Sequence, residues 1–165
     1  MKAIEIEVAV AHHFGTRQNL IVPNTSWGLS MHECDLLVMT KAGFLYEVEI
    51  KVTKADLKRD AKKPHGHDNV RLKRLYFALP EKIAKECMDL IPFHAGVLAV
   101  KPVEDGVFYH EIVECLRKAV DRKGARFVTP DEAYAIARLG ALRIWGLKEK
   151  IIELDKKNKK PVSKC

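Results

Sequence analysis

The sequence lacks the features that mark several common classes of protein. It has no run of about 18 apolar residues, the length a helix needs to cross a membrane, and its N-terminal stretch is acidic, without the apolar core of a signal peptide. It contains no Walker-type phosphate loop, no glycine-rich dinucleotide fingerprint, no nucleophile elbow and no internal repeat. We therefore expect no membrane partner, and none of these familiar nucleotide or acyl-transfer sites.

Cysteine is scarce and unpaired in the sequence. The four cysteines, at positions 34, 87, 115 and 165, form no Cys-x-x-Cys pair. Such scattering fits a reducing compartment better than a disulfide framework or a zinc knuckle. The expected location is the cytoplasm.

Positive charge is in excess. The 165 residues include 29 Lys and Arg against 22 Asp and Glu, a formal charge of +7. A basic surface favours polyanions such as nucleic acid, although a merely soluble basic protein has the same balance. The length predicts one domain over residues 1–155, followed by a basic flexible tail over 156–165.

The most informative stretch is a predicted β-hairpin over residues 35–51. Two apolar, strand-like runs flank Lys41-Ala42-Gly43, the pattern of a three-residue loop closed by a glycine in the left-handed region. Such a loop fixes the register of the two strands. Asp35 then lies directly opposite Glu49, close enough for their side chains to interact.

Alternation along the hairpin separates an apolar face from an acidic one. The second face carries Asp35, Glu47, Glu49 and Lys51. Like charges directly across a ladder destabilise a sheet, so this arrangement needs a compensating cation. Hard divalent ions prefer carboxylate oxygens, and the pattern favours a metal site. The alternative is an ordinary solvated outer face, and a one-residue slip in register would also remove the site.

Periodicity and turn signals predict a mixed α/β fold. Thr53 and Asp56 form a capping-box pattern, and Thr129-Pro130 is a strong helix start. Helices are expected over 3–14, 54–63, 81–90 and 129–154, and strands over 18–23, 35–40, 44–51, 71–79, 95–100 and 107–113.

These residues resemble a known superfamily. Asp35 in one strand, then Glu49-Ile50-Lys51 in the next, then a helix, is similar to the PD-(D/E)xK or restriction-endonuclease-like nucleases. The longer run 46–57, followed by 73–80, looks like the MmcB-type DNA-repair nucleases and related phage proteins. The resemblance implies a restriction-endonuclease-like core, with a mixed sheet flanked by helices and here a long C-terminal helix. The proline that names the motif is Cys34 in this chain.

The resemblance also implies roles for individual residues. Asp35, Glu49 and the backbone carbonyl of Ile50 would hold Mg²⁺ or Mn²⁺, and Lys51 would help to activate the attacking water. Glu7 is the candidate for the additional acid that many members present from the first helix, with Glu5 in reserve. Glu47 lies outside the motif and is either a second-metal ligand or an influence on the local field.

Basic residues after the hairpin offer a track for DNA phosphates, which would bind without sequence preference and in a salt-sensitive manner. A solvated lysine-rich face is the alternative. The expected DNA-binding residues are Lys54, Lys58, Arg59, Lys62, Lys63, Arg71, Lys73 and Arg74.

Two further segments are ambiguous. His65-Gly66-His67 invites a zinc assignment, but the sequence offers no matching ligand pair, so a flexible loop closing over substrate is favoured. The apolar residues of the C-terminal helix predict core or dimer surface, which would make the chain a homodimer. The expected function is a metal-dependent deoxyribonuclease in DNA repair, recombination or phage DNA processing. A non-catalytic nucleic-acid-binding module and a protein-interaction subunit are the alternatives.

Overall fold

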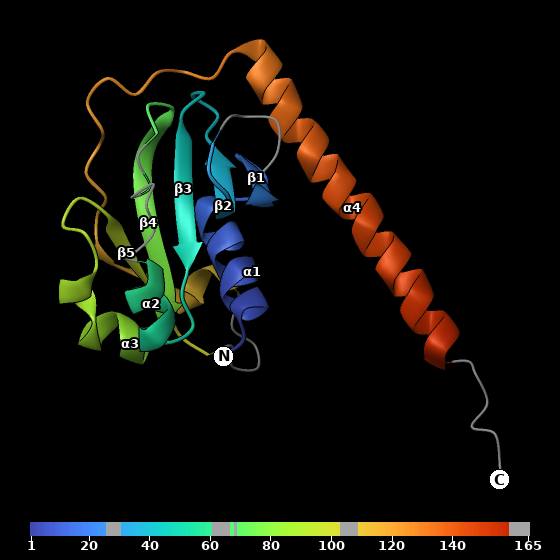
Figure 1. Cartoon of the computed structure of the whole chain (residues 1–165), viewed down its shortest axis with the longest axis horizontal. Helices are drawn as coiled ribbons and strands as arrows, with labels where there is room; N and C mark the ends of the chain where they lie inside the picture. The colour runs from blue at the N-terminus through green and yellow to red at the C-terminus, as the bar shows by residue number, and fades with distance from the viewer. Residues whose placement is uncertain (26–30, 61–66, 68, 103–108, 159–165) are drawn as a thin grey trace, which may run out of the picture.

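A six-stranded mixed sheet organises the chain (Figure 1). The computed structural model describes residues 1–25, 31–60, 67, 69–102 and 109–158, without the side chains of 110 and 111. Strands follow one another in sequence order across the sheet. The first three are antiparallel, the third, fourth and fifth run parallel, and the sixth is antiparallel to the fifth. The strands are β1 (Leu20–Thr25), β2 (Cys34–Met39), β3 (Leu45–Ile50), β4 (Leu72–Pro80), β5 (Gly96–Val100) and β6 (Val113–Arg117).

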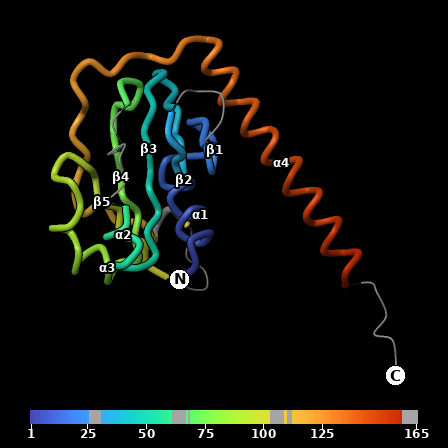
Figure 2. The backbone as a smooth tube through the Cα atoms, in the orientation of Figure 1, coloured from blue at the N-terminus to red at the C-terminus, as the bar shows by residue number. Residues whose placement is uncertain are grey.

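Helices lie on both faces of this sheet, which confirms the predicted α/β class with a mixed sheet and a long C-terminal helix. The smoothed trace in Figure 2 shows the long connection that leads from β6 around the body to the last helix. The helices are α1 (Ala3–Phe14), α2 (Lys54–Asp60), α3 (Glu81–Glu86) and α4 (Pro130–Asn158), with short 3-10 turns η1 (Met88–Leu90) and η2 (Tyr109–Ile112).

The predicted hairpin and its register are confirmed. Gly43 adopts φ 81°, a conformation that favours glycine, and the backbone N–H of Thr40 donates to the carbonyl of Phe44 at 2.9 Å. Leu37 therefore pairs with Glu47, and the same register carries Asp35 towards Glu49 at the far end of the hairpin. The sequence of one tight turn thus positions the acidic residues of two strands.

Three apolar cores form between the sheet and the helices packed on it. The first packs α1 on one face, through Ile6 and Val10 against residues such as Val48. The other face carries two separate cores, one beneath α2 and α3 that includes Phe77, and one beneath the start of α4 that includes Leu37. The acidic side chains of β3 share this second face with both of them.

Helix α4 has a capped start and an exposed end. Thr129 and Glu132 form a capping box, in which the Glu132 N–H donates to Thr129 Oγ1 at 3.2 Å and the Thr129 N–H to Glu132 Oε2 at 2.9 Å. Ile136 and Leu139 are buried against the sheet. Farther on, Trp145 is 61% exposed, and the helix leads away from the body in Figure 1. A homodimer through this surface stays a prediction.

Several predicted boundaries shift. β1 passes through Pro23, where the strand was expected to end, because an edge strand does not need that N–H for its ladder. The strand predicted over 107–113 is wrong over 109–112, where η2 forms, and β6 begins only at Val113, where the chain pairs with Val100 of β5; residues 107 and 108 lie outside the described residues. Helix α4 extends to Asn158, into the predicted tail, and residues 159–165 lie outside the described part.

Candidate metal centre

Three of the predicted site residues meet where β3 ends. The Lys51 ammonium forms an ion pair with Glu49 Oε2 and lies 3.7 Å from Asp35 Oδ2. Asp35 Oδ2 also accepts a 2.7 Å hydrogen bond from the backbone N–H of Ile50. The parallel ladder continues past β3, because the Lys51 N–H donates to the carbonyl of Ala78. Asp35, Glu49 and Lys51 are therefore brought together, with the Ile50 backbone beside them.

Asp60, which the sequence did not single out, joins this group from the last turn of α2. Its Oδ1 atom lies 2.9 Å from the Lys51 ammonium. The helix is oriented by its cap, since the Asp56 N–H donates to Thr53 Oγ1 at 3.1 Å, as the capping box predicts. Leu57 and Asp60 lie one turn apart on the buried face of this helix, so Asp60 is directed towards the sheet. The sequence contains only a weak indication of this role, because Asp60 lies one helical turn after the apolar Leu57 and therefore on the same face of α2.

Two histidines hold Glu47, the additional acid. His32 Nε2 lies 2.7 Å and His67 Nδ1 2.8 Å from the same oxygen, Glu47 Oε1. The other ring nitrogen of His67 lies 2.7 Å from Asp60 Oδ2. His32 was not anticipated, because nothing in its local sequence indicates a site. His67 was assigned to a flexible loop, but its side chain is buried in the cluster; His65 and Gly66 lie outside the described residues.

The acidic face of the hairpin is buried, so the alternative of a solvated outer face is wrong. Glu47 is 0%, Glu49 1% and Asp60 5% exposed. The two apolar cores on this side of the sheet flank these carboxylates. Charges buried in this way are costly unless they are paired or coordinate a cation. Only Asp35, with 40% of its side chain exposed, opens to solvent among these four acids.

Three groups of the cluster, Glu49, Glu47 and His67, have pKa values shifted by burial and by their partners. Burial raises the pKa of Glu49, and Lys51 only partly offsets the effect. Burial would also raise the pKa of Glu47, but hydrogen bonds with His32 and His67 outweigh it and the net shift is downward. Burial lowers the pKa of His67, while Asp60 and Glu47 oppose this and raise it to about 9.

The third predicted acid, Glu7, is near enough to interact with Asp35. Burial raises the pKa of Glu7, and the charge of Asp35 raises it further. The reserve candidate, Glu5, has another role: it accepts the backbone N–H of Lys2 at 2.5 Å and so caps α1. Glu7 therefore remains the better candidate from the first helix.

The predicted DNA track divides between two ends of the sheet. Lys54, Lys58 and Arg59 are exposed on α2, beside the site, and Arg59 forms an ion pair with Asp56 of the same helix. Arg74 pairs with Tyr46 near the start of β3, at the opposite end of that strand from Lys51. The basic residues at that end are engaged in ion pairs, Arg71 with Glu132 and Lys73 and Arg74 with Asp121. Lys62 and Lys63 lie outside the described residues.

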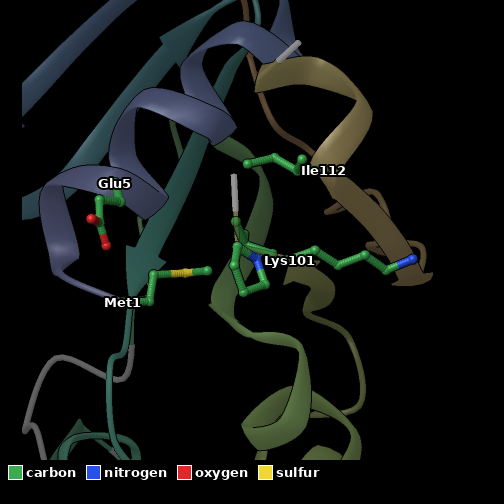
Figure 3. Close-up of a pocket in the computed structure, with 6 residues that line it drawn as sticks. Met1, Glu5, Lys101 and Ile112 are labelled. Carbon is green, nitrogen blue, oxygen red and sulfur yellow. The ribbon is translucent and has the colours of Figure 1, made fainter. Parts of the chain in front are cut away.

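A separate hollow lies at the start of α1. It has a volume of about 270 Å³ and is lined by Met1, Glu5, Val100, Lys101, Pro102 and Ile112 (Figure 3). Of the predicted site residues it includes only Glu5, the helix cap. The hollow and the acidic cluster are thus different features of the molecule.

Comparison with known proteins identifies a similar fold but no function. No model of a known protein family and no curated protein matches the chain. The structure is similar to that of a protein of unknown function from Silicibacter pomeroyi, with a TM-score of 0.61 and 17% identity over 99% of this chain and 98% of that one. Within the described residues, none of the helices has the length and apolar character required to span a membrane.

Proposed function

We propose that the chain is a metal-dependent deoxyribonuclease of the PD-(D/E)xK type. The observation that supports this most strongly is the meeting of Asp35, Glu49 and Lys51 at the end of β3. These are the three motif residues on which the resemblance depends. The donor set suits Mg²⁺ or Mn²⁺, which prefer carboxylate oxygens, and the solvent-exposed Asp35 suits an ion that keeps several waters.

In this proposal each side chain has a defined task. Asp35 and Glu49 hold the ion, and the Ile50 carbonyl completes the set from the backbone. A bound divalent ion would orient the phosphodiester, favour ionisation of the attacking water and stabilise charge on the phosphoryl oxygens. Lys51 supplies a positive charge beside the phosphate, and Asp60, 2.9 Å from its ammonium, keeps it in place when Glu49 turns to the ion.

Lysines on α2 supply the surface for the substrate. Lys54, Lys58 and Arg59 are exposed on the helix that begins directly after the site. Phosphate contacts of this kind give affinity that falls steeply with salt and does not depend on sequence. The three described cysteines are free thiols, which supports a reducing compartment such as the cytoplasm.

A cleavage assay with matched variants tests the proposal. Wild-type protein with Mg²⁺ or Mn²⁺ should cut at least one of single-stranded, duplex and branched DNA. Asp35→Asn should abolish cutting and preserve folding, since Asp35 is partly exposed, and Glu49→Gln should also stop cutting. The control, Glu33→Gln, removes an exposed acid two residues from Asp35 and should leave the rate unchanged. Equal rates for Asp35→Asn and Glu33→Gln would refute the assignment.

A non-catalytic DNA-binding module is the second candidate, and one observation favours it. The Lys51 ammonium already neutralises Glu49 and lies near Asp35, so the trio also works as a buried ion-pair network. This candidate predicts salt-sensitive DNA binding that weakens in Lys54→Ala, Lys58→Ala and Arg59→Ala, with no cleavage of any substrate under any divalent ion.

A further inference from the structure

The histidine-bearing end of the acidic cluster differs chemically from the end that contains Asp35. Glu47 Oε1 lies 2.7 Å from His32 Nε2 and 2.8 Å from His67 Nδ1. The donor atoms of these three residues all lie within 4.8 Å of one another. Two imidazoles and one carboxylate form the ligand set that suits zinc and similar transition-metal ions, whereas Mg²⁺ prefers oxygen donors alone.

His67 is oriented as a metal-binding histidine requires. One ring nitrogen faces Glu47, and the other lies 2.7 Å from Asp60 Oδ2. Metal-ligating histidines commonly donate the second ring N–H to a carboxylate, which fixes the tautomer and the ring orientation. Phe77 packs edge-on against the same ring, with a centroid distance of 5.8 Å. The ring is therefore held from three sides, with Nδ1 directed into the cluster.

An unsatisfied oxygen supports a cation at this place. Among the described residues, Glu47 Oε2 is buried without a hydrogen-bond partner. A buried acceptor without a partner is costly, and a metal ion held by Glu47 would satisfy it.

We propose that His32, Glu47 and His67 form a second, separate metal site that binds a zinc-type transition-metal ion, with Asp60 as the positioning residue for His67. Donor atoms around tetrahedral zinc lie about 3.4 Å apart, so the present set needs shifts of only about 1 Å. Glu49 and Asp60 also lie near His67, but both already contact the Lys51 ammonium. The site does not depend on nuclease activity, because binding alone defines it.

Metal titration of the full chain tests this proposal. The protein is stripped with a chelator and titrated with ZnCl₂, and separately with MgCl₂, by calorimetry, with bound metal counted by elemental analysis. Wild type should bind one equivalent of Zn²⁺ at least 100-fold more tightly than Mg²⁺. His32→Gln and His67→Gln should each weaken Zn²⁺ binding at least 10-fold, and Asp60→Asn should weaken it by 10- to 100-fold with the stoichiometry unchanged.

Two controls separate this site from its neighbours. His13→Gln removes an exposed histidine on α1, and Asp35→Asn removes a ligand of the proposed Mg²⁺ site; both should leave Zn²⁺ affinity unchanged. Co²⁺ absorption in the visible range reports the nitrogen ligands directly and should change in His32→Gln. His32 lies outside the helices and strands, so this variant tests the site even if His67→Gln fails to fold. Equal Zn²⁺ affinity in wild type, His32→Gln and His13→Gln would overturn the proposal, as would the absence of Zn²⁺ binding.

Discussion

Replacing Lys51 by methionine should destabilise the fold strongly, because the ammonium neutralises buried carboxylates. Its side chain is only 8% exposed, and it forms ion pairs with Glu49 and Asp60, which are themselves almost fully buried. Removing one partner of a buried ion pair costs about 3–5 kcal/mol, since the other charge stays buried and unpaired. For a domain of this size that corresponds to a fall in melting temperature of about 6–20 °C.

Urea denaturation followed by circular dichroism, at pH 7 with a chelator present, measures this loss. Lys118→Met removes an exposed lysine and should change the free energy of unfolding by less than about 0.5 kcal/mol. The double variant Lys51→Met with Glu49→Gln should recover at least about 1 kcal/mol relative to the sum of the single variants, because the two groups interact directly. A loss below about 1 kcal/mol in Lys51→Met would refute the reasoning that the buried acids depend on this cation.

Other positions give independent tests. Arg126 lowers the pKa of Glu132 from 4.5 to about 2, with smaller contributions from the Thr129 N–H and Arg71. The Glu132 carboxylate therefore stabilises the fold fully above about pH 4.5, and this stabilisation is lost as the pH falls towards 2. Glu132→Gln should therefore cost about 1 kcal/mol in urea melts at pH 7 and almost nothing at pH 2; an equal cost at both would contradict this. Gly96→Ala should lower the melting temperature, because its Cβ would lie 2.4 Å from the Tyr76 ring, whereas Gly146→Ala meets no atom within 4 Å and should only increase helix content by circular dichroism.

The hairpin and its register could be predicted because the information is local. A three-residue loop ending in Gly43 permits one pairing of the flanking strands, and that pairing brings Asp35 and Glu49 to the same end. The capped starts of α2 and α4 were predictable for the same reason. Each depends on side chains only three residues apart.

The burial of the acidic face could not be read from the strands themselves. Alternation shows that Glu47 and Glu49 share a face, but it does not show whether helices cover that face. Asp60 contacts Lys51, and His67 contacts Glu47, although both residues follow the hairpin in the sequence. His32, which also contacts Glu47, precedes the hairpin. Their convergence depends on tertiary packing, which local patterns in a single sequence do not encode.

The division of the predicted DNA track has a similar cause. Lys58 and Arg74 are close in sequence, and a sequence pattern places them on one surface. The connection from β3 through α2 leads back to the end of the sheet where β3 begins, because β4 runs parallel to β3. Arg74 therefore lies beside Tyr46 rather than Lys51. Because β3 and β4 run parallel, the connection between them necessarily separates residues at its two ends in this way.

Helix α4 is one continuous element with two energetically different halves. Its first turns are anchored by Ile136 and Leu139, whereas every residue from Ile144 to Asn158 except Gly146 is exposed. A helical segment of about 15 residues has only marginal stability in water when no tertiary contact supports it. The far half of α4 therefore contributes little to the cooperative unfolding of the domain, and it can melt and re-form without disturbing the carboxylates and histidines around Lys51.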